Sequence, residues 1–398
     1  MDDATALLIT VTGRDRPGVT SALCATLADQ GARILDMEQV VIRDRLILGL
    51  LVSLGGDEAA ARAAVEETAR GLGVEVEFAP MASRRPGGDA PKHYVTVLGQ
   101  PLPPQAMAAI TRQISDCGGN IERITRLSRY PILSFELLVS GCQTDGLKQR
   151  LAEEAARQHV DVAIQRASLL RRAKRLICMD VDSTLVQGEV IEMLADHAGC
   201  GDQVAAITAR AMAGELDFEQ SLRERVRLLE GLPVTAVDKV RDSIQLTPGA
   251  RTLVRTLKRL GYAVAIVSGG FTQVTDSLRD ELELDFAMAN TLEVVDGVLT
   301  GNLVGPIVDR EGKALALERF ATEAGVPLSQ TVAVGDGAND LDMLARAGLG
   351  IAFNAKPVVR QAADTAVSVP YLDAILFLLG ITREEIEAAD AEDGPPDH

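Results

Sequence analysis

Four polar stretches, far apart in the chain, carry the residue types that phosphoryl chemistry needs, and each would lie at the end of a buried strand. Carboxylates in the first and last stretches suit Mg²⁺, which prefers carboxylate, carbonyl and water oxygens. A hydroxyl, backbone amides and a lysine between them suit a phosphoryl group, which binds well to amides near a helix N-terminus. The stretches are Asp180-Val181-Asp182-Ser183-Thr184, Val267-Ser268-Gly269-Gly270, Lys313 and Gly335-Asp336-Gly337-Ala338-Asn339-Asp340.

The two aspartates of the first stretch can divide the chemical work. Asp180 and Asp182 lie two positions apart, so in an extended turn both side chains can face one crevice. One can attack phosphorus while the other gives a proton to the leaving oxygen, provided that the spread negative charge is neutralised. Asp336 and Asp180 are the expected metal ligands, with Asp340 as a candidate helper.

The remaining polar groups fit the transferred phosphoryl group. Lys313 is a compact cation that can reach both the phosphoryl oxygens and the nucleophile, and Ser268 and the Gly269 amide can donate to a phosphate oxygen. Each stretch alone has a plainer interpretation: a surface turn or helix cap for the first, a calcium-type loop for the last, a structural turn for Ser-Gly-Gly and a solvated side chain for Lys313. Their joint occurrence, in this order, favours phosphoryl transfer.

The composition is that of a globular protein with several domains. The chain has 398 residues, 47% hydrophobic and 24% charged; at roughly 100–200 residues per domain, this predicts two to four domains. The net charge of −17 argues against a nucleic-acid partner, because a phosphate backbone needs a concentrated basic surface. No apolar run reaches the roughly 18 residues of a membrane span, and the acidic start lacks a signal-peptide pattern, so we expect a cytoplasmic protein without membrane partners. Five cysteines without CxxC spacing predict reduced thiols and no zinc site.

The polar stretches must be positioned by the strands and helices around them. The order of these predicted elements indicates a doubly wound α/β domain over residues 174–385. Apolar runs suited to buried strands alternate with helices, and in such a sheet ligands sit beyond the carboxyl ends of the strands. Residues 188–246 look wholly helical and predict an inserted cap, residues 290–308 predict a hairpin insert, and residues 386–398 predict a disordered acidic tail. The strand runs are Leu176–Val181, Tyr262–Val267, Asp285–Ala289 and Thr331–Val334.

The N-terminal half predicts two tandem βαββαβ units, residues 1–80 and 93–168, joined by a Pro/Gly/basic linker over residues 81–92. The order of strand-like and helix-like runs is the same in both, which predicts ferredoxin-like antiparallel sheets with helices on one face. Sequence identity between the two units is low, so the repeat rests on element order.

Residues 174–375 resemble the haloacid dehalogenase-like phosphohydrolases, whose core is a Rossmann-like sheet under a helical cap. The cap sequence is similar to that of members that hydrolyse phosphoserine. The stretches that carry the resemblance are MDVDSTLVQGEVIEMLADHAG (179–199), ITARAMAGELDFEQSLRERVRLL (207–229), YAVAIVSGGF (262–271) and TVAVGDGANDLDML (331–344).

This resemblance implies Mg²⁺-dependent hydrolysis of O-phospho-L-serine, the last step of serine biosynthesis. It implies Asp180 as the nucleophile that becomes an aspartyl-phosphate, and Asp182 as general acid and then general base. Glu189 would meet the substrate ammonium and Arg225 its carboxylate, unless both are only solvated helix charges. The remaining implied roles are Met212 and Phe218 in the cap pocket, Ser268, Gly269, Lys313 and Asn339 on phosphate, and Asp180, Asp336 and the Asp182 carbonyl on Mg²⁺.

Other functions remain open. A phosphotransferase, or a phosphatase acting on another small phosphorylated alcohol, would share every motif. An amino-acid-sensing module with vestigial phosphatase activity would not need the intact acidic and lysine residues.

The two N-terminal units resemble ACT-type regulatory domains, which bind amino acids at interfaces between units. The first keeps the turn Asp15-Arg16-Pro17-Gly18-Val19, where Gly18 can let amides approach a ligand carboxylate, whereas the second has Pro103-Pro104-Gln105-Ala106 there. The resemblance implies L-serine as a feedback effector at Asp15, Gly18 and Val19, and a homodimer through these domains. The alternative is that both units only assemble the enzyme.

Overall fold

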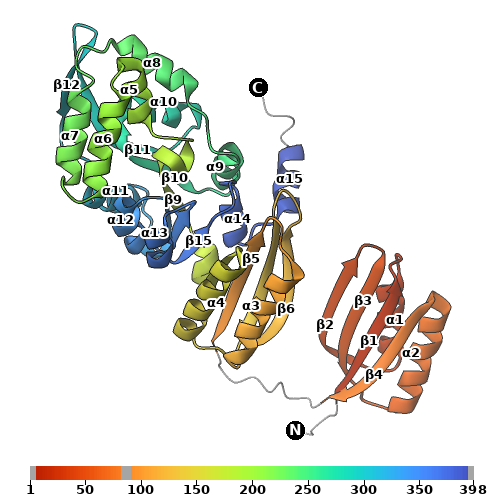
Figure 1. Ribbon diagram of the computed structural model, residues 1–398. Helices are drawn as coiled ribbons and strands as arrows, with labels where there is room; N and C mark the ends of the chain where they lie inside the picture. The colour runs from red at the N-terminus through yellow and green to blue at the C-terminus, as the bar shows by residue number, and fades with distance from the viewer. Residues whose placement is uncertain (1–5, 82–90, 393–398) are drawn as a thin grey trace. The chain divides into compact units, whose positions relative to one another are not determined.

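The computed structural model describes residues 6–81 and 91–392, and the chain divides into two compact units, residues 1–89 and 90–398 (Figure 1). Both units have the α/β architecture that the sequence predicts. None of the helices within the described residues is long and apolar enough to cross a membrane.

The first unit is a βαββαβ domain whose two helices cover one face of an antiparallel sheet. Residues of β3 alternate between buried and exposed, as expected for a sheet with one covered face. Asp57 caps α2 by accepting from the Ala59 and Ala60 amides, and Gly73 ends this helix in a left-handed conformation. The strand order is β2-β3-β1-β4, and the elements are β1 (Ala6–Arg14), α1 (Val19–Asp29), β2 (Arg33–Ile42), β3 (Arg45–Ser53), α2 (Glu58–Leu72) and β4 (Val74–Met81).

The outer strand β2 of this unit exposes large apolar side chains on both of its faces. Val40 and Ile42 are 53% and 59% exposed, where an edge strand would be expected to carry charges. The exposed apolar residues of the strand are Ile34, Leu35, Met37, Val40, Val41 and Ile42.

The second unit opens with another βαββαβ domain. Its strand order, β6-β7-β5-β8, matches that of the first domain position by position, so the predicted repeat is confirmed. Its elements are β5 (Lys92–Gly99), α3 (Pro104–Asp116), β6 (Asn120–Ser128), β7 (Leu133–Ser140), α4 (Thr144–Gln158) and β8 (Asp161–Arg166).

A seven-stranded sheet follows, in the order β12-β11-β10-β9-β13-β14-β15, with β12 antiparallel and the other neighbours parallel. Alternate residues of β9 enter two different hydrophobic clusters, so helices cover both faces and the doubly wound prediction is confirmed. The strands are β9 (Leu176–Asp180), β10 (Ala263–Phe271), β11 (Phe286–Val295), β12 (Val298–Val304), β13 (Thr331–Gly335), β14 (Gly350–Phe353) and β15 (Thr365–Val367). The helices are α9 (Ala250–Arg259), α10 (Thr272–Glu281), α11 (Arg310–Glu323), α12 (Leu341–Arg346), α13 (Pro357–Ala362), α14 (Ala374–Leu378) and α15 (Arg383–Glu392).

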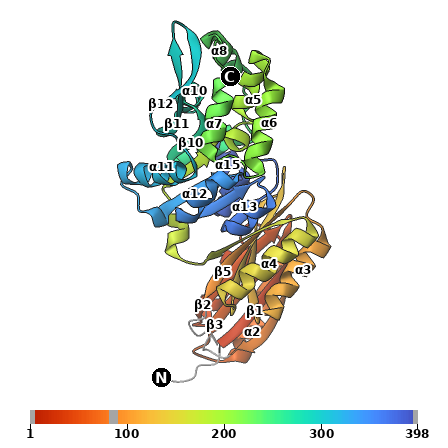
Figure 2. The same cartoon turned by 60° about the vertical axis from the view of Figure 1, so that its left-hand side comes forward.

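Four helices between β9 and β10 form the cap, which lies beside the β11–β12 hairpin (Figures 1 and 2). The two chain segments that connect the cap to the core meet in a bridge between Val186 and Leu246. Asp217 and Gln220 form a reciprocal capping box that fixes the start of α7. The cap helices are α5 (Val190–Ala198), α6 (Gly201–Met212), α7 (Phe218–Arg227) and α8 (Val234–Ser243).

The second βαββαβ domain has a hydrophobic core of its own and also packs against the domain that contains the seven-stranded sheet. Asp161 at the start of β8 accepts a hydrogen bond from the Ser368 amide, and Gln165 donates to the Leu378 carbonyl. Buried Arg171 pairs with Glu136 and stacks over Tyr94 at 4.2 Å. Leu98, Leu127, Ile132 and Ala163 from this domain belong to the same hydrophobic cluster as residues of the seven-stranded sheet and its helices.

The predicted disordered tail is wrong for residues 386–392, which belong to α15. Asp390 of this helix forms ion pairs with Arg255 and Arg259 of α9, and Ile386 is buried. These contacts come from distant parts of the chain, so the acidic composition that suggested disorder did not reveal them. Residues 393–398 of the predicted tail, and 82–90 of the predicted linker, lie outside the described residues; Met81 and Lys92 are strand residues.

Candidate active site

The strand β9 ends at Asp180, whose side chain is buried, and the chain then turns sharply. Ser183 takes the left-handed conformation at φ 58, and its amide donates to the Gly188 carbonyl over 3.0 Å. The turn leaves Asp182 beside the amide of Val190 at the start of α5, which donates to Asp182 Oδ1 over 2.8 Å. Asp182 therefore also fixes the first cap helix.

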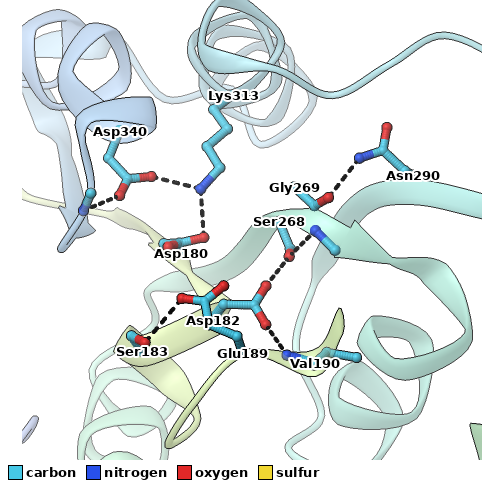
Figure 3. A network of polar contacts seen from close by, with 12 residues as sticks. Asp180, Asp182, Ser183, Glu189, Val190, Ser268, Gly269, Asn290, Lys313 and Asp340 are labelled. Atoms are coloured by element: carbon cyan, nitrogen blue, oxygen red, sulfur yellow. Dashed lines mark hydrogen bonds and ion pairs between the residues drawn. The ribbon is translucent and has the colours of Figure 1, made fainter. Parts of the chain in front are cut away.

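A buried lysine joins two buried carboxylates. Lys313 Nζ lies 2.6 Å from Asp180 Oδ1 and 2.7 Å from Asp340 Oδ1, and the Lys313 side chain is 1% exposed (Figure 3). Burial alone would lower the pKa of Lys313, but the two carboxylates outweigh it and the pKa stands well above its usual value. Burial and the nearby Asp340 raise the pKa of Asp180. Lys313 is thus a permanent cation against the predicted nucleophile.

The last polar stretch supplies a third carboxylate. Oxygens of Asp180, Asp336 and Asp340 lie within 4.8 Å of one another, and burial together with Asp340 raises the pKa of Asp336 to about 6. A divalent cation with hard oxygen ligands fits this set, because it would offset the crowded negative charge. Asp340 also accepts from the Gly337 amide over 2.9 Å, so both of its oxygens already have protein partners.

The Ser-Gly-Gly stretch ends β10 beside Asp182. Ser268 Oγ donates to Asp182 Oδ2 over 2.9 Å and accepts from the Gly270 amide over 2.7 Å. A side chain at Gly270 would lie 2.9 Å from Ser268 Oγ and 3.0 Å from Asp182 Oδ2, so this close approach needs glycine.

The cap brings its predicted substrate residues over this edge of the sheet. The Phe218 ring lies 3.0 Å from where a Cβ of Gly269 would be, which places the start of α7 directly on the Ser-Gly-Gly stretch. Glu189 is exposed as a residue, yet its carboxylate accepts from Ser183 Oγ at 3.2 Å, and desolvation with the charges of Asp182 and Asp336 raises its pKa to about 7.

Arg225, also on α7, is partly buried. Burial lowers the pKa of its guanidinium, against the attraction of Glu189, its leading charged neighbour. Its Nε donates to the Ser221 carbonyl at 3.3 Å. The two terminal NH₂ groups of the guanidinium, which form a planar fork with Nε, are left to bind a ligand. Met212 ends α6, and its side chain lies outside the described part of the structure.

The structure also places residues whose roles the sequence did not reveal. Asn290, fully buried on β11, donates to the Gly269 carbonyl and accepts from the Val308 amide, both at 2.8 Å. Asp340 anchors Lys313 as well as lying in the acidic cluster. Asn339 is partly buried, with its Oδ1 2.2 Å from where a Cβ of Gly337 would be. No local signal marks Asn290, which was predicted only as the start of the hairpin insert.

The predicted regulatory turn lies at the start of α1 in the first unit. Gly18 caps the helix at φ 95, a conformation that favours glycine, and Asp15 is exposed, its amide donating to the Asp44 carbonyl. The Val19 side chain is 2% exposed, so only its backbone could meet a ligand. In the second domain the equivalent helix begins at Pro104, which has no amide to donate.

Comparison with known proteins agrees with this division of the chain. Residues 174–348 match the haloacid dehalogenase-like hydrolase family, and residues 5–79 and 91–165 each match an ACT domain family. Fold and site therefore define a haloacid dehalogenase-like hydrolase that carries two ACT domains.

Similar proteins narrow this class. The phosphoserine phosphatase of Streptomyces coelicolor is 59% identical, over 98% of this chain and 95% of its own length. Phosphoserine phosphatase SerB2 of Mycobacterium tuberculosis is 54% identical, over 98% of this chain and 96% of its own. The solved structure of a haloacid dehalogenase-family hydrolase from Salmonella enterica superposes with a TM-score of 0.65 at 30% identity, over 72% of this chain and 98% of its own. The chain belongs to the phosphoserine phosphatase family.

Proposed function

We propose that this protein is a Mg²⁺-dependent phosphatase that hydrolyses O-phospho-L-serine to L-serine and phosphate. The observation that carries the proposal is the Lys313 ammonium held against Asp180, with Asp182 and Ser268 beside them. This group lies beneath a cap that presents Glu189 and Arg225, the charges that a phosphorylated amino acid needs.

Hydrolysis proceeds through two displacements at phosphorus. An Asp180 carboxylate oxygen attacks phosphorus, the ester bond to the serine oxygen breaks, and Asp182 gives that oxygen its proton. Water then attacks the aspartyl-phosphate, Asp182 takes the water proton, and phosphate leaves with the Asp180 carboxylate restored. Lys313 offsets charge on the phosphoryl oxygens throughout.

Mg²⁺ would be held by Asp180, Asp336 and the Asp182 carbonyl, and when bound it neutralises charge on the phosphoryl oxygens. Ser268, the Gly269 amide and Asn339 would hold the phosphate. Glu189 would bind the substrate ammonium, and the Arg225 fork would bind its carboxylate in the bidentate geometry that guanidinium favours. Phe218 and Met212 would shape the pocket between these charges.

A phosphate-release screen over phosphoamino acids and sugar phosphates, with Mg²⁺ and with chelator, tests this function. We expect phosphoserine to be the best substrate, with activity lost in chelator and in Asp180→Asn. Turnover by Asp180→Asn within about tenfold of wild type would refute the covalent route, since loss of a nucleophile costs far more. A transferred phosphoryl group, found by product analysis with added alcohols, would favour the phosphotransferase alternative instead.

We further propose that the protein is a cytoplasmic homodimer inhibited by its product, L-serine. The serine carboxylate would bind the amides around Gly18, with Asp15 near its ammonium, at an interface with the second domain of a partner chain. The exposed apolar side chains of β2 support dimerisation, because an uncovered apolar edge strand is a ready surface for a second copy.

Paired glycine substitutions test the regulatory site. Gly18→Ala and Gly31→Ala each force a side chain into a left-handed position, at φ 95 and φ 66, and neither new Cβ meets an atom within 4 Å. We expect Gly18→Ala alone to weaken inhibition by serine. Coupling of this kind is typically about 5–150-fold. If serine inhibits both variants equally and purely in competition with substrate, the N-terminal domains serve only to assemble the enzyme.

A further inference from the structure

A chain of hydrogen bonds links buried Asn290 to Asp182, the acid of the proposed reaction (Figure 3). Asn290 Nδ2 donates to the Gly269 carbonyl over 2.8 Å, and the amide of the same peptide unit, on Gly270, donates to Ser268 Oγ over 2.7 Å. Ser268 Oγ then donates to Asp182 Oδ2 over 2.9 Å. The peptide between Gly269 and Gly270 is therefore held at both ends.

The two hydrogen bonds that hold the Gly269–Gly270 peptide fix the direction of the single Ser268 hydroxyl proton. The hydroxyl has one proton to donate, and the Gly270 amide occupies an acceptor position on the oxygen, so the proton is free to face Asp182. If the peptide rotated, the Gly270 amide would leave Ser268, and the hydroxyl would lose its fixed direction.

Asn290 also ties this peptide to the lysine. Its Oδ1 accepts from the Val308 amide over 2.8 Å, next to Asp309, which caps α11 by accepting from Gly312. Lys313 lies in the first turn of that helix. One buried amide side chain thus spans the two segments that carry Ser268 and Lys313.

We propose that Asn290 is a positioning residue for the reaction: it orients the Gly269–Gly270 peptide so that Ser268 holds Asp182 in its working direction. The proposal rests on the proposed function, because it acts through Asp182. A bystander in the core would affect only folding, whereas a positioning residue affects the rate of the folded enzyme through Ser268.

The matched pair Asn290→Asp and Gln273→Glu tests this role. Each change turns a side-chain amide into a carboxylate that faces a backbone carbonyl. Gln273 Nε2 donates over 2.9 Å to the carbonyl of Leu292, two residues from Asn290 on β11. When it is ionised, the carboxylate of the Asn290→Asp variant can still accept from the Val308 amide but cannot donate to the Gly269 carbonyl. We expect kcat to fall about 10–100-fold with KM within about threefold, as for a small misplacement of a reacting group, while Gln273→Glu stays near wild type.

A double-mutant cycle with Ser268→Ala decides how Asn290 acts. If Asn290 acts through Ser268, the double variant should be within about threefold of Ser268→Ala alone. Losses that multiply would overturn the proposal, as would a folded Asn290→Asp enzyme with wild-type kcat. Asn290→Leu, which removes both hydrogen bonds, is taken through the same cycle, with circular dichroism to measure the folded fraction. Inactive wild-type protein would refute the proposed function and this role together. An active wild type whose two kcat losses multiply would refute only the role of Asn290.

Discussion

Replacing Asp340 by asparagine should destabilise the catalytic domain more than the loss of a surface ion pair does. Asp340 is fully buried, and its two oxygens accept from different donors, Lys313 Nζ at 2.7 Å and the Gly337 amide at 2.9 Å. Asparagine keeps the shape but has one oxygen and one NH₂ group. Whichever way the amide turns, its NH₂ meets a donor.

The size of the effect follows from the burial of this pair. Leaving a buried donor without its acceptor costs about 1–3 kcal/mol. Lys313 keeps Asp180 as a partner, so the larger cost of an uncompensated buried charge does not arise. For a domain of this size, about 1 kcal/mol shifts Tm by about 2–4 °C, so Tm should fall by on the order of 5 °C. Lys313 would then rely on Asp180 alone, so the pKa of Lys313 should fall and its bond to Asp180, the proposed nucleophile, should tighten, which would lower kcat as well.

Asp342→Asn is the matched control, two residues further along the chain. Asp342 pairs with Arg310 across side chains that are 37% and 51% exposed, and such pairs contribute about 0–1 kcal/mol. Scanning calorimetry of the full chain measures both variants, and the transition that phosphate with Mg²⁺ raises identifies the catalytic domain. Equal shifts for the two variants, or an Asp340→Asn protein with unchanged Tm and kcat, would refute the reasoning.

Three further outcomes follow from the site and the domain contacts. Arg225→Ala should lose roughly 30–1,000-fold in kcat/KM on phosphoserine, the equivalent of about 2–4 kcal/mol. It should lose much less on a phosphate ester without a carboxylate. Equal losses on the two esters would mean that Arg225 has a structural role. Because the pKa of Glu189 is raised to about 7, its carboxylate gains a proton as pH falls through 7, and KM for phosphoserine should rise between pH 8 and pH 6. A Glu189→Gln enzyme that keeps this rise would contradict the assignment of Glu189 to the substrate ammonium. A fragment of residues 90–398 should fold and hydrolyse phosphoserine. A fragment of residues 174–398 should aggregate or melt at lower temperature, because it would expose the apolar surface that Leu98, Leu127 and Ile132 cover. Equal Tm values for the two fragments would show that these contacts contribute little.

Much of the fold could be predicted from local pattern. The apolar runs of β9, β10 and β13 each stop at a polar residue, and parallel strands bring those ends to one edge of the sheet. Asp180 and Ser268 could therefore be expected to approach each other, as could the helical cap and the tandem βαββαβ order. These features depend on periodicity and on chain breaks, which neighbouring residues specify.

The same local reasoning failed for residues 386–392. Their acidic composition predicted disorder, yet α15 is held by ion pairs from Asp390 to α9, more than a hundred positions earlier in the chain. Composition reports how much apolar surface a segment can bury, but not whether a distant segment offers partners for its charges.

The sequence by itself determined which residue types stand at the strand ends, and so the class of chemistry. Only the tertiary structure decided that Asp340 shares Lys313 with Asp180 and that Asn290 clamps the Gly269 peptide. It also decided that the second βαββαβ domain, which has its own core, adds a few side chains to the hydrophobic cluster of the catalytic domain. Each of these depends on a buried polar or apolar partner far away in the chain. A buried group must find such a partner or carry a large desolvation cost, but its identity depends on how the sheets and helices pack, which no local pattern records.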